Sequence, residues 1–474
     1  MPIPRNHYFR KGEGRVRTSS SKVYLLFGLL VVKLPLFGQE KSAASSLIEI
    51  PPLTASFPLA KLENSTIGTP TPVVPSQSVN REVLTLDELV LEALEKNPEI
   101  LAARRKFDAA TKRPSQVSTL PEPKFSFTNL GVGHPASALN GSDFAYVGVG
   151  VSQEFPFPGK LSLMKQVAKK EADSERQMVL ETELRVVSRL KRAYYDLYYS
   201  HKAIEIVEKN RELLDKFTKI AEAKYRVGSG IQQDVLKAQV EISTLMQRLE
   251  MLGQQKASLS AFVNSLLDRP VSTELGTPAQ VNKSQLNRPL EELLRVAQEN
   301  APRIRSRQEM LDSGAFALNL ARKEYMPDFG GSFQYQKTGS LYPDYYMATL
   351  EVKVPLYFWR KQRLGVEEAA TRLVEMRHEY RMTSQEISFG VKDQFLMAKT
   401  SERLLAMYEQ GVIPQAAASL ESALAGYQTG KVDFLTLINN LTVLLNFEMD
   451  YYRELSNQQK AVARLEEFVG VKLQ

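Results

Sequence analysis

Apolar residues recur every three or four positions along two unusually long stretches of the chain, and this spacing predicts long amphipathic helices. The first stretch, between Gly159 and Gly228, contains neither proline nor glycine. At 1.5 Å per residue, such a helix would be roughly 100 Å long. Its apolar positions follow a coiled-coil seam, although an ordinary core-facing stripe would give a similar pattern. The second stretch, residues 362–427, contains Gly411 and Pro414, so we expect a kink or a short non-helical insert there.

Ahead of each long stretch the period of the pattern changes from about 3.6 to about 2, which predicts a pair of β-strands. The first pair covers residues 123–130 and 144–155, and the second covers residues 329–336 and 345–357. One face of these segments is apolar, and the other face is polar or carries glycine. Strands of about ten residues with this alternation suit a barrel wall that has lipid outside and water inside.

The chain repeats this plan once, with a period of about 200 residues. Each repeat begins with an amphipathic helix, continues with a strand pair and ends with a long helix and a glycine turn. The opening helix near Leu86 has acids in its first turn, as a capped helix should. The fold class is therefore mainly α with a small β portion, built from a duplicated helix-hairpin-long-helix repeat. The matching segments are 88–98 with 291–302, 151–157 with 350–356, and 225–228 with 427–430.

The sequence divides into a leader, a tether and the two repeats. The leader, residues 1–38, has basic residues ahead of an apolar run of about ten residues, which is typical of a secretory signal peptide. A single anchoring helix is the alternative, but a membrane span needs about 20 apolar residues. Residues 39–83 are rich in proline, serine and threonine and predict a disordered tether. The repeats then occupy residues 84–285 and 286–474.

The amino-acid composition excludes several classes of function. Only 43% of the chain is hydrophobic, and no apolar run after the leader is long enough for a membrane helix, so any membrane crossing must use strands. The leader carries six of the seven net positive charges, which argues against a nucleic-acid partner. There is no cysteine, and no catalytic or phosphate-binding motif is present. We therefore expect neither an enzyme nor a bound cofactor.

Four strands per chain cannot close a barrel, so several chains must complete it. Two chains would supply eight strands and a filled interior, whereas three would supply twelve and begin to leave a lumen. The long helices of all chains would then form a tube below the barrel. A non-porous coiled-coil scaffold of the cell envelope is the alternative, and it accounts for the helices but not for the duplicated hairpins.

Aromatic residues gather where the predicted strands pass into the long helices. Such a cluster suits an interfacial girdle against outer-membrane lipid, and core packing is the alternative. The residues are Phe155, Phe157, Tyr357, Phe358 and Trp359, which is the only tryptophan.

Four short motifs accompany the duplicated plan. They are Leu-Thr-Leu-Asp-Glu-Leu at 84–89, Asn-Pro at 97–98, Phe-Pro-Phe-Pro-Gly-Lys at 155–160 and Tyr-Arg-Val-Gly at 225–228. Together these features resemble the TolC-like outer membrane factor family over nearly all of residues 84–473. The resemblance implies a homotrimer with a shared 12-stranded β-barrel in the cell outer membrane and a long α-helical coiled-coil tunnel that extends into the periplasm. It further implies a passive exit duct of a tripartite efflux or type I secretion system, with a periplasmic adaptor (a membrane fusion protein) and an inner-membrane pump as partners.

The resemblance also implies that the two glycine turns are the helical tips at which the adaptor docks. Glycine suits a tight reversal between antiparallel helices whether or not a partner binds there. The tip residues are Val227, Gly228 and Ser229 in the first repeat and Thr429, Gly430 and Lys431 in the second.

Many relatives narrow the tip with acidic residues after the second glycine turn, and this chain departs from that pattern. Its candidate constriction holds Asp433, Thr436 and Asn439, of which only Asp433 is acidic. Three Asp433 carboxylates could form a ring in the lumen. An exposed acid at a helix start, favoured by the helix dipole, is the alternative.

The exit motif at 156–160 is similar to that of the heavy-metal (cobalt-zinc-cadmium) branch, which is paired with resistance-nodulation-division pumps. The histidines after the leader, His134, His201 and His378, are widely spaced, and there is no methionine cluster. We therefore predict no metal site in the chain. His201 lies in the helical seam pattern, where packing is a more common role than metal ligation.

Overall fold

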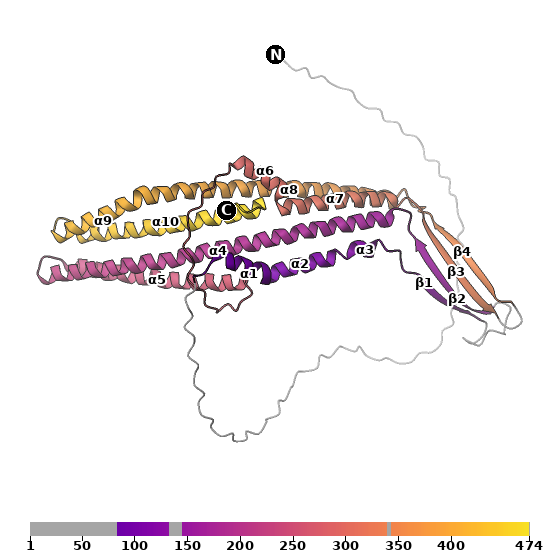
Figure 1. The fold of residues 1–474 in the computed structure, drawn as a ribbon, viewed down its shortest axis with the longest axis horizontal. Helices are drawn as coiled ribbons and strands as arrows, with labels where there is room; N and C mark the ends of the chain where they lie inside the picture. The colour runs from indigo at the N-terminus through magenta and orange to yellow at the C-terminus, as the bar shows by residue number, and fades with distance from the viewer. Residues whose placement is uncertain (1–82, 132–144, 339–342, 474) are drawn as a thin grey trace, which may run out of the picture. The chain divides into compact units, whose positions relative to one another are not determined.

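The computed structural model describes residues 83–131, 145–338 and 343–473, which form long helices and one small sheet (Figure 1). The predicted mainly α fold with a small β portion is confirmed. The predicted leader lies outside the described residues, as does the tether apart from Val83. The elements of the first half are α1 Leu86–Lys96, α2 Pro98–Ala110, α3 Arg113–Val117, β1 Lys124–Leu130, β2 Tyr146–Phe155, α4 Lys160–Arg226 and α5 Gln232–Leu266.

The second half repeats this order without a counterpart of α3. Each half therefore has a broken helical start, two strands and a long helical hairpin (Figure 1). Its elements are α6 Leu290–Asn300, α7 Pro302–Lys323, β3 Asp328–Thr338, β4 Tyr345–Lys353, α8 Lys361–Met407, the π-helical turn η1 Tyr408–Val412, α9 Ile413–Gln428 and α10 Phe434–Val469.

The long helices match the prediction in the first half of the chain and differ from it in the second half. α4 is a single helix of 67 residues, as the absence of proline and glycine predicts. In the second half the expected non-helical insert is wrong, because the chain stays helical through η1 and into α9, and the expected kink stays a prediction. Pro414 lies in the first turn of α9. The wider π-helical turn ahead of it accommodates a residue that has no N–H to donate.

The four strands form one antiparallel sheet in the order β1-β2-β3-β4. The pairing of β2 with β3 joins the two halves of the chain, with Gly150 opposite Gln334 at its centre. β4 ends at Lys353, so the prediction that this strand extends to residue 357 is wrong. Pro355 follows two residues later, and a proline cannot donate a ladder hydrogen bond.

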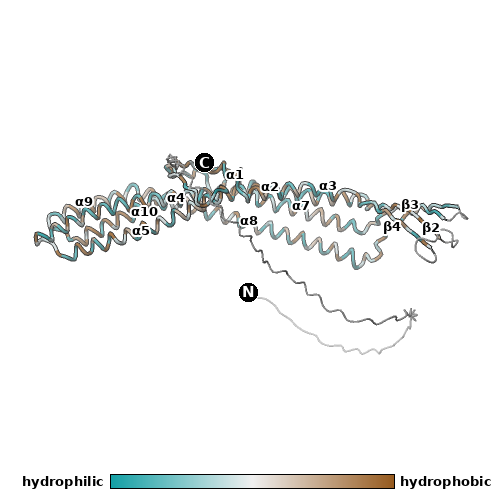
Figure 2. The backbone as a smooth tube through the Cα atoms, turned by 90° about the horizontal axis from the view of Figure 1, so that it is seen from below, coloured by the Kyte–Doolittle hydropathy of each residue, from teal (hydrophilic) through white to brown (hydrophobic). Residues whose placement is uncertain are grey.

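Between residues 83 and 473, the strands lie at one end of the long helices and the α4–α5 and α9–α10 turns lie at the other (Figure 1). α4 packs against α5, α7 and α10, and α8 packs against α7 and α10. Figure 2 shows hydrophobic and hydrophilic positions alternating along these helices. Buried apolar side chains of α4, α5, α9 and α10 form one cluster, which includes Phe217, Ala238, Leu420 and Leu437. None of the helices in the described part of the chain is long and apolar enough to cross a bilayer.

Asn97 explains why the first helical segment breaks after α1. Its side-chain oxygen accepts hydrogen bonds from the backbone N–H groups of Glu99 (2.9 Å) and Ile100 (3.2 Å), which caps α2. Its amide donates to the carbonyl of Leu266 at the end of α5 (2.8 Å). Thr85, by contrast, precedes α1 without a side-chain capping bond, although the sequence predicts a capped start there.

Candidate channel wall and helical tips

The sheet has one apolar and one polar face. Residues paired directly across antiparallel strands lie on the same face, and successive residues alternate between faces. Phe125 on the apolar face is 82% exposed and Leu350 is 83% exposed, so no described residue covers these two side chains. Its central rows are Phe125, Val151, Phe333 and Ala348, then Phe127, Val149, Tyr335 and Tyr346; the opposite rows are Ser126, Gly150, Gln334 and Met347, then Thr128, Gly148, Gln336 and Tyr345.

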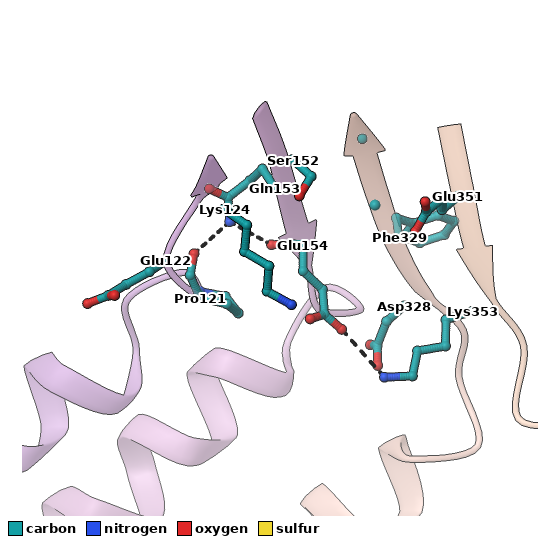
Figure 3. A pocket seen from close by; sticks show the side chains of 12 residues that line it. Pro121, Glu122, Lys124, Ser152, Gln153, Glu154, Asp328, Phe329, Glu351 and Lys353 are labelled. Carbon is teal, nitrogen blue, oxygen red and sulfur yellow. Dashed lines mark hydrogen bonds and ion pairs between the residues drawn. The ribbon is translucent and has the colours of Figure 1, made fainter. Parts of the chain in front are cut away.

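The polar face becomes charged near the helices, where it borders a cavity of about 250 Å³ (Figure 3). Glu154 and Lys353, from strands β2 and β4, form an ion pair across β3 at 3.5 Å. Gln153 lies on the other face and ties the end of β2 to the chain ahead of β1, through a 2.7 Å bond to the carbonyl of Pro121. The charged side chains at this cavity are Glu122, Lys124, Glu154, Asp328, Glu351 and Lys353.

Lys160 joins the start of α4, in the first half of the chain, to the start of β3, in the second half. Its side chain is only 3% exposed, and its Nζ lies 2.8 Å from the Asp328 carboxylate and 3.4 Å from that of Glu324. Asp328 also accepts a 2.8 Å hydrogen bond from the backbone N–H of Phe157. Sequence reasoning missed this cluster, because nothing local to Lys160 reveals partners that follow more than 160 residues later.

The aromatic residues of the strand-to-helix exits occupy two different surroundings. Phe155, at the end of β2, lies on the apolar face of the sheet, and Phe157 is half-buried with the Lys323 Nζ 5.5 Å from its ring centre. Tyr357, Phe358 and Trp359 lie exposed in the turn between β4 and α8. The Trp359 ring meets those of Phe358 and Tyr357 edge to face, at 5.1 Å and 6.2 Å.

The two glycine turns have the same backbone geometry. Gly228 and Gly430 adopt the left-handed region, with φ of 73° and 75°. In each turn the glycine N–H and the N–H that follows it bond back to the last helical turn, the Schellman arrangement that glycine favours. The bonds are Gly228 to Tyr225 (3.0 Å), Ser229 to Lys224 (2.9 Å), Gly430 to Tyr427 (3.2 Å) and Lys431 to Gly426 (2.8 Å).

A polar cluster that the sequence did not reveal joins the two turns. Lys224 of α4 donates to the carbonyl of Tyr427 at the end of α9, and its Nζ lies 4.3 Å from the centre of the Tyr427 ring. Burial and the nearby carboxylate of Asp234 raise the pKa of Tyr427 to about 12. Burial also raises the pKa of Asp234 itself, and the charge of Asp433 adds to this effect. The first turn of α5, with Asp234, and the start of α10, with Asp433, are therefore close enough for their charges to interact.

Asp433 is the N-cap residue of α10. Its carboxylate accepts a 2.7 Å hydrogen bond from the backbone N–H of Thr436, and hydrogen bonding from Thr436 lowers the pKa of Asp433. Asp433, Thr436 and Asn439 are all exposed and recur at intervals of three, so they lie along one side of the first two helical turns.

His201 is half-buried on α4, and this burial lowers its pKa to about 4, with a smaller effect from Lys256. The imidazole is therefore neutral near neutral pH. No group of three or more histidine, aspartate or glutamate side chains in the described parts of the chain could hold a metal ion. His134 lies outside the described residues.

The two halves of the chain each match one family model, described as outer membrane efflux protein, at residues 89–266 and 293–471. The chain belongs to the outer membrane efflux protein family. The two matches confirm the duplication and the resemblance to TolC-like channels at the level of the family. Proteins of this family are efflux channels of the outer membrane rather than enzymes.

Solved structures of outer membrane proteins share the fold of this family member. VceC of Vibrio cholerae is 18% identical, with a TM-score of 0.70 over 82% of this chain and 97% of its own. The CmeC channel of Campylobacter jejuni is 14% identical, with a TM-score of 0.68 over 86% and 94%. The open state of the MtrE channel of Neisseria gonorrhoeae is 15% identical, with a TM-score of 0.67 over 82% and 89%. A search of curated proteins finds no match to this sequence.

Proposed function

We propose that three copies of this chain form a passive exit duct, which receives substrates from an inner-membrane pump through a periplasmic adaptor. The observation that carries the proposal is the sheet with one apolar and one polar face. Among the described residues, β1 and β4 each pair on one side only, which leaves two edges for neighbouring copies. Three such sheets supply the strands of a barrel with lipid outside and a watery lumen inside.

In this proposal the barrel spans the outer membrane, and the long helices of the three copies form a tunnel in the periplasm. Residues 1–38 direct export, residues 39–83 form a tether, and residues 84–285 and 286–474 are the two repeat units. The system is a tripartite efflux or type I secretion system. The alternative remains a coiled-coil envelope scaffold without a pore, which leaves the exposed apolar face of the sheet without a role.

Membrane fractionation distinguishes the duct from the scaffold. The full-length chain is expressed in a Gram-negative host and the outer membrane is separated. The mass of the detergent-extracted protein is then measured by native mass spectrometry. The duct should be found in the outer-membrane fraction at about three chain masses. Recovery of the protein in the soluble periplasmic fraction, at any stoichiometry, would contradict the duct.

The exit residues 156–160 support a place in the heavy-metal branch, with a resistance-nodulation-division pump as partner and the metal as cargo. Deleting the gene for this chain should then lower the tolerance of its host to zinc, cobalt or cadmium. Unchanged tolerance to all three ions, in a host that has no second duct, would contradict this assignment.

We also propose that Trp359, with Phe155, Phe157, Tyr357 and Phe358, forms an interfacial girdle. Trp359 is the only tryptophan and is 57% exposed, so its fluorescence reports its own surroundings. Lipids brominated near the headgroup should quench this fluorescence more strongly than lipids brominated near the end of the acyl chain. Equal and weak quenching by both lipids would instead favour packing inside the protein.

The glycine turns are the proposed docking tips for the adaptor. Val227 is 78% exposed, and Lys431 projects from the matching turn, so substitutions there can alter the surface without disturbing a core. Val227→Asp with Lys431→Glu should lower recovery of the adaptor of the same system by at least tenfold in co-purification. Leu91→Asp with Lys112→Glu, two exposed positions far from the tips, is the matched control. Equal recovery with both double variants would rule out docking at the tips.

Asp433 is the proposed source of cation preference at the constriction, where Thr436 and Asn439 add only neutral groups. Asp433→Asn removes the charge but keeps an oxygen that caps α10, because asparagine is as good an N-cap as aspartate. The variant should shift the reversal potential of single channels toward lower cation selectivity. Asp268→Asn, at the far end of α5, should leave it unchanged. Identical reversal potentials for both variants would place Asp433 outside the lumen.

A further inference from the structure

One side of α10 carries polar residues along most of its length. They recur at alternating intervals of four and three residues, which is the spacing of a coiled-coil seam, and none of them is buried. This polar stripe continues the line of Thr436 and Asn439 toward the sheet, with Val443 as its apolar member. In the proposed trimer the polar stripe therefore lines the tunnel. Its central members are Asn446, Asp450, Arg453, Asn457, Lys460 and Arg464.

The part of the polar stripe nearest the sheet is basic. Arg453 donates to the carboxylate of Asp450 at 2.6 Å. Lys460 donates to the carboxylate of Asp196 on α4, also at 2.6 Å. Arg464, by contrast, is exposed, and no described residue forms an ion pair or a side-chain hydrogen bond with it. Its guanidinium group is therefore available to a ligand.

A second arginine, Arg192 of α4, lies beside Arg464. α4 and α10 pack against each other and run in opposite directions, and the ion pair between Asp196 and Lys460 sets their register. One helical turn further along both helices, Arg192 faces Arg464. Burial lowers the pKa of Arg192, and the like charge of Arg464 adds to this effect. The Arg192 side chain donates only to the carbonyl of Ser188, at 3.4 Å.

The other charges that act on Arg192 do not neutralise the arginine pair. They belong to Glu467, Arg189 and Asp196. Asp196 is engaged by a lysine of α10, and Arg189 by a glutamate of α2. Glu467 forms no ion pair with either arginine, and its single charge leaves the pair with a net positive charge. Two neighbouring guanidinium groups without a carboxylate between them repel each other, and an anion relieves that repulsion.

We propose that Arg192 and Arg464 bind an oxyanion, a phosphate or carboxylate group, that enters from the tunnel. A guanidinium group presents N–H donors in a planar fork that matches two oxygens of such a group. The inference deepens the proposed function and rests on it, because the polar stripe faces a watery lumen only in the duct. The positive charge repels metal cations, so the site serves an anionic group whether or not metal ions also pass.

Sodium tripolyphosphate is the probe, and isothermal titration calorimetry of the full-length, detergent-solubilised protein at low ionic strength measures its binding. The wild type should bind the probe saturably. Arg464→Gln should weaken binding at least tenfold, because charge-assisted hydrogen bonds to one guanidinium group are lost. Arg295→Gln, at an exposed position of α6 away from the polar stripe, is the matched control and should bind as the wild type does.

Arg464→Glu tests the proximity of the two arginines independently of the ligand. The new carboxylate should pair with Arg192, so the melting temperature of the ligand-free protein should rise while binding of tripolyphosphate is lost. A lower melting temperature together with unchanged binding would mean that the two side chains do not form one site.

Single-channel recording separates this site from the duct itself. Tripolyphosphate should interrupt the current of the wild type, and it should not interrupt that of Arg464→Gln. Saturable binding by a protein that carries no current would support the oxyanion site and contradict the duct. A steady current without saturable binding, or equal affinities for Arg464→Gln and Arg295→Gln, would overturn the site and leave the duct in place.

Discussion

Phe333→Arg is expected to prevent insertion of the protein into lipid bilayers, whereas Ser332→Arg, one residue away, is not. Phe333 lies in the central strand β3, on the apolar face of the sheet, between Val151 and Ala348. An arginine on the lipid face near the middle of a bilayer costs about 2–4 kcal/mol, and a trimer incurs that cost three times. Ser332 lies at the same depth on the polar face, between Ser152 and Thr349, where water can solvate an arginine.

Refolding from urea into lipid vesicles measures this difference, with the folded fraction followed by protease protection. The wild type and Ser332→Arg should give protected trimers in similar yield, and Phe333→Arg should give almost none. Equal yields for the two arginine variants would mean that the two faces of the sheet do not divide lipid from water. The assignment of the sheet to a barrel wall would then be wrong.

Lys160→Met should destabilise the protein by about 3 kcal/mol, toward the lower end of the range for breaking a buried ion pair by removing one partner. Lys160 is almost fully buried, whereas Asp328 keeps some contact with solvent and Glu324 is half exposed, which lowers the cost of leaving these acids unpaired. The loss should be concentrated at the junction where β2 passes into α4 and α7 passes into β3.

Thermal and urea denaturation of the detergent-solubilised protein should show the loss for Lys160→Met. Lys165→Met, an exposed lysine one turn along α4, should change stability little. Adding Asp328→Asn to Lys160→Met should restore part of the loss, because asparagine removes the unpaired charge but keeps an acceptor for the N–H of Phe157. If Lys160→Met and Lys165→Met have the same stability, the buried cluster does not hold the junction together.

Local patterns in the sequence were sufficient for the repeat, the strands and the long helices. α4 follows from 67 residues without proline or glycine, and the two faces of the sheet follow from a period of two. The sequence-based prediction was wrong at positions where one local sequence signal is compatible with more than one structure. Gly411 and Pro414 predicted a kink or a non-helical insert, but a π-helical turn keeps the chain helical there.

Contacts between the two repeats could not be predicted from the sequence. Lys160 with Asp328, and Lys224 with Tyr427, join segments more than 160 residues apart, and their register depends on how the helices pack rather than on any local signal. The cavity of about 580 Å³ between α1, α4, α7 and α10 is of the same kind, because its walls come from four helices distant in the chain. Burial of a lysine at a helix start is visible only once the neighbouring helix is in place.

Conductance in a planar lipid bilayer tests the central claim most directly. The purified, detergent-solubilised trimer is added to one side of the bilayer, and single-channel current is recorded over a range of voltages. Discrete and stable channel events are expected, with a conductance that scales with salt concentration, as a watery lumen requires. A verified trimer that inserts into the bilayer but carries no current, even when Lys224→Ala loosens the link between the two tips, would contradict the exit duct.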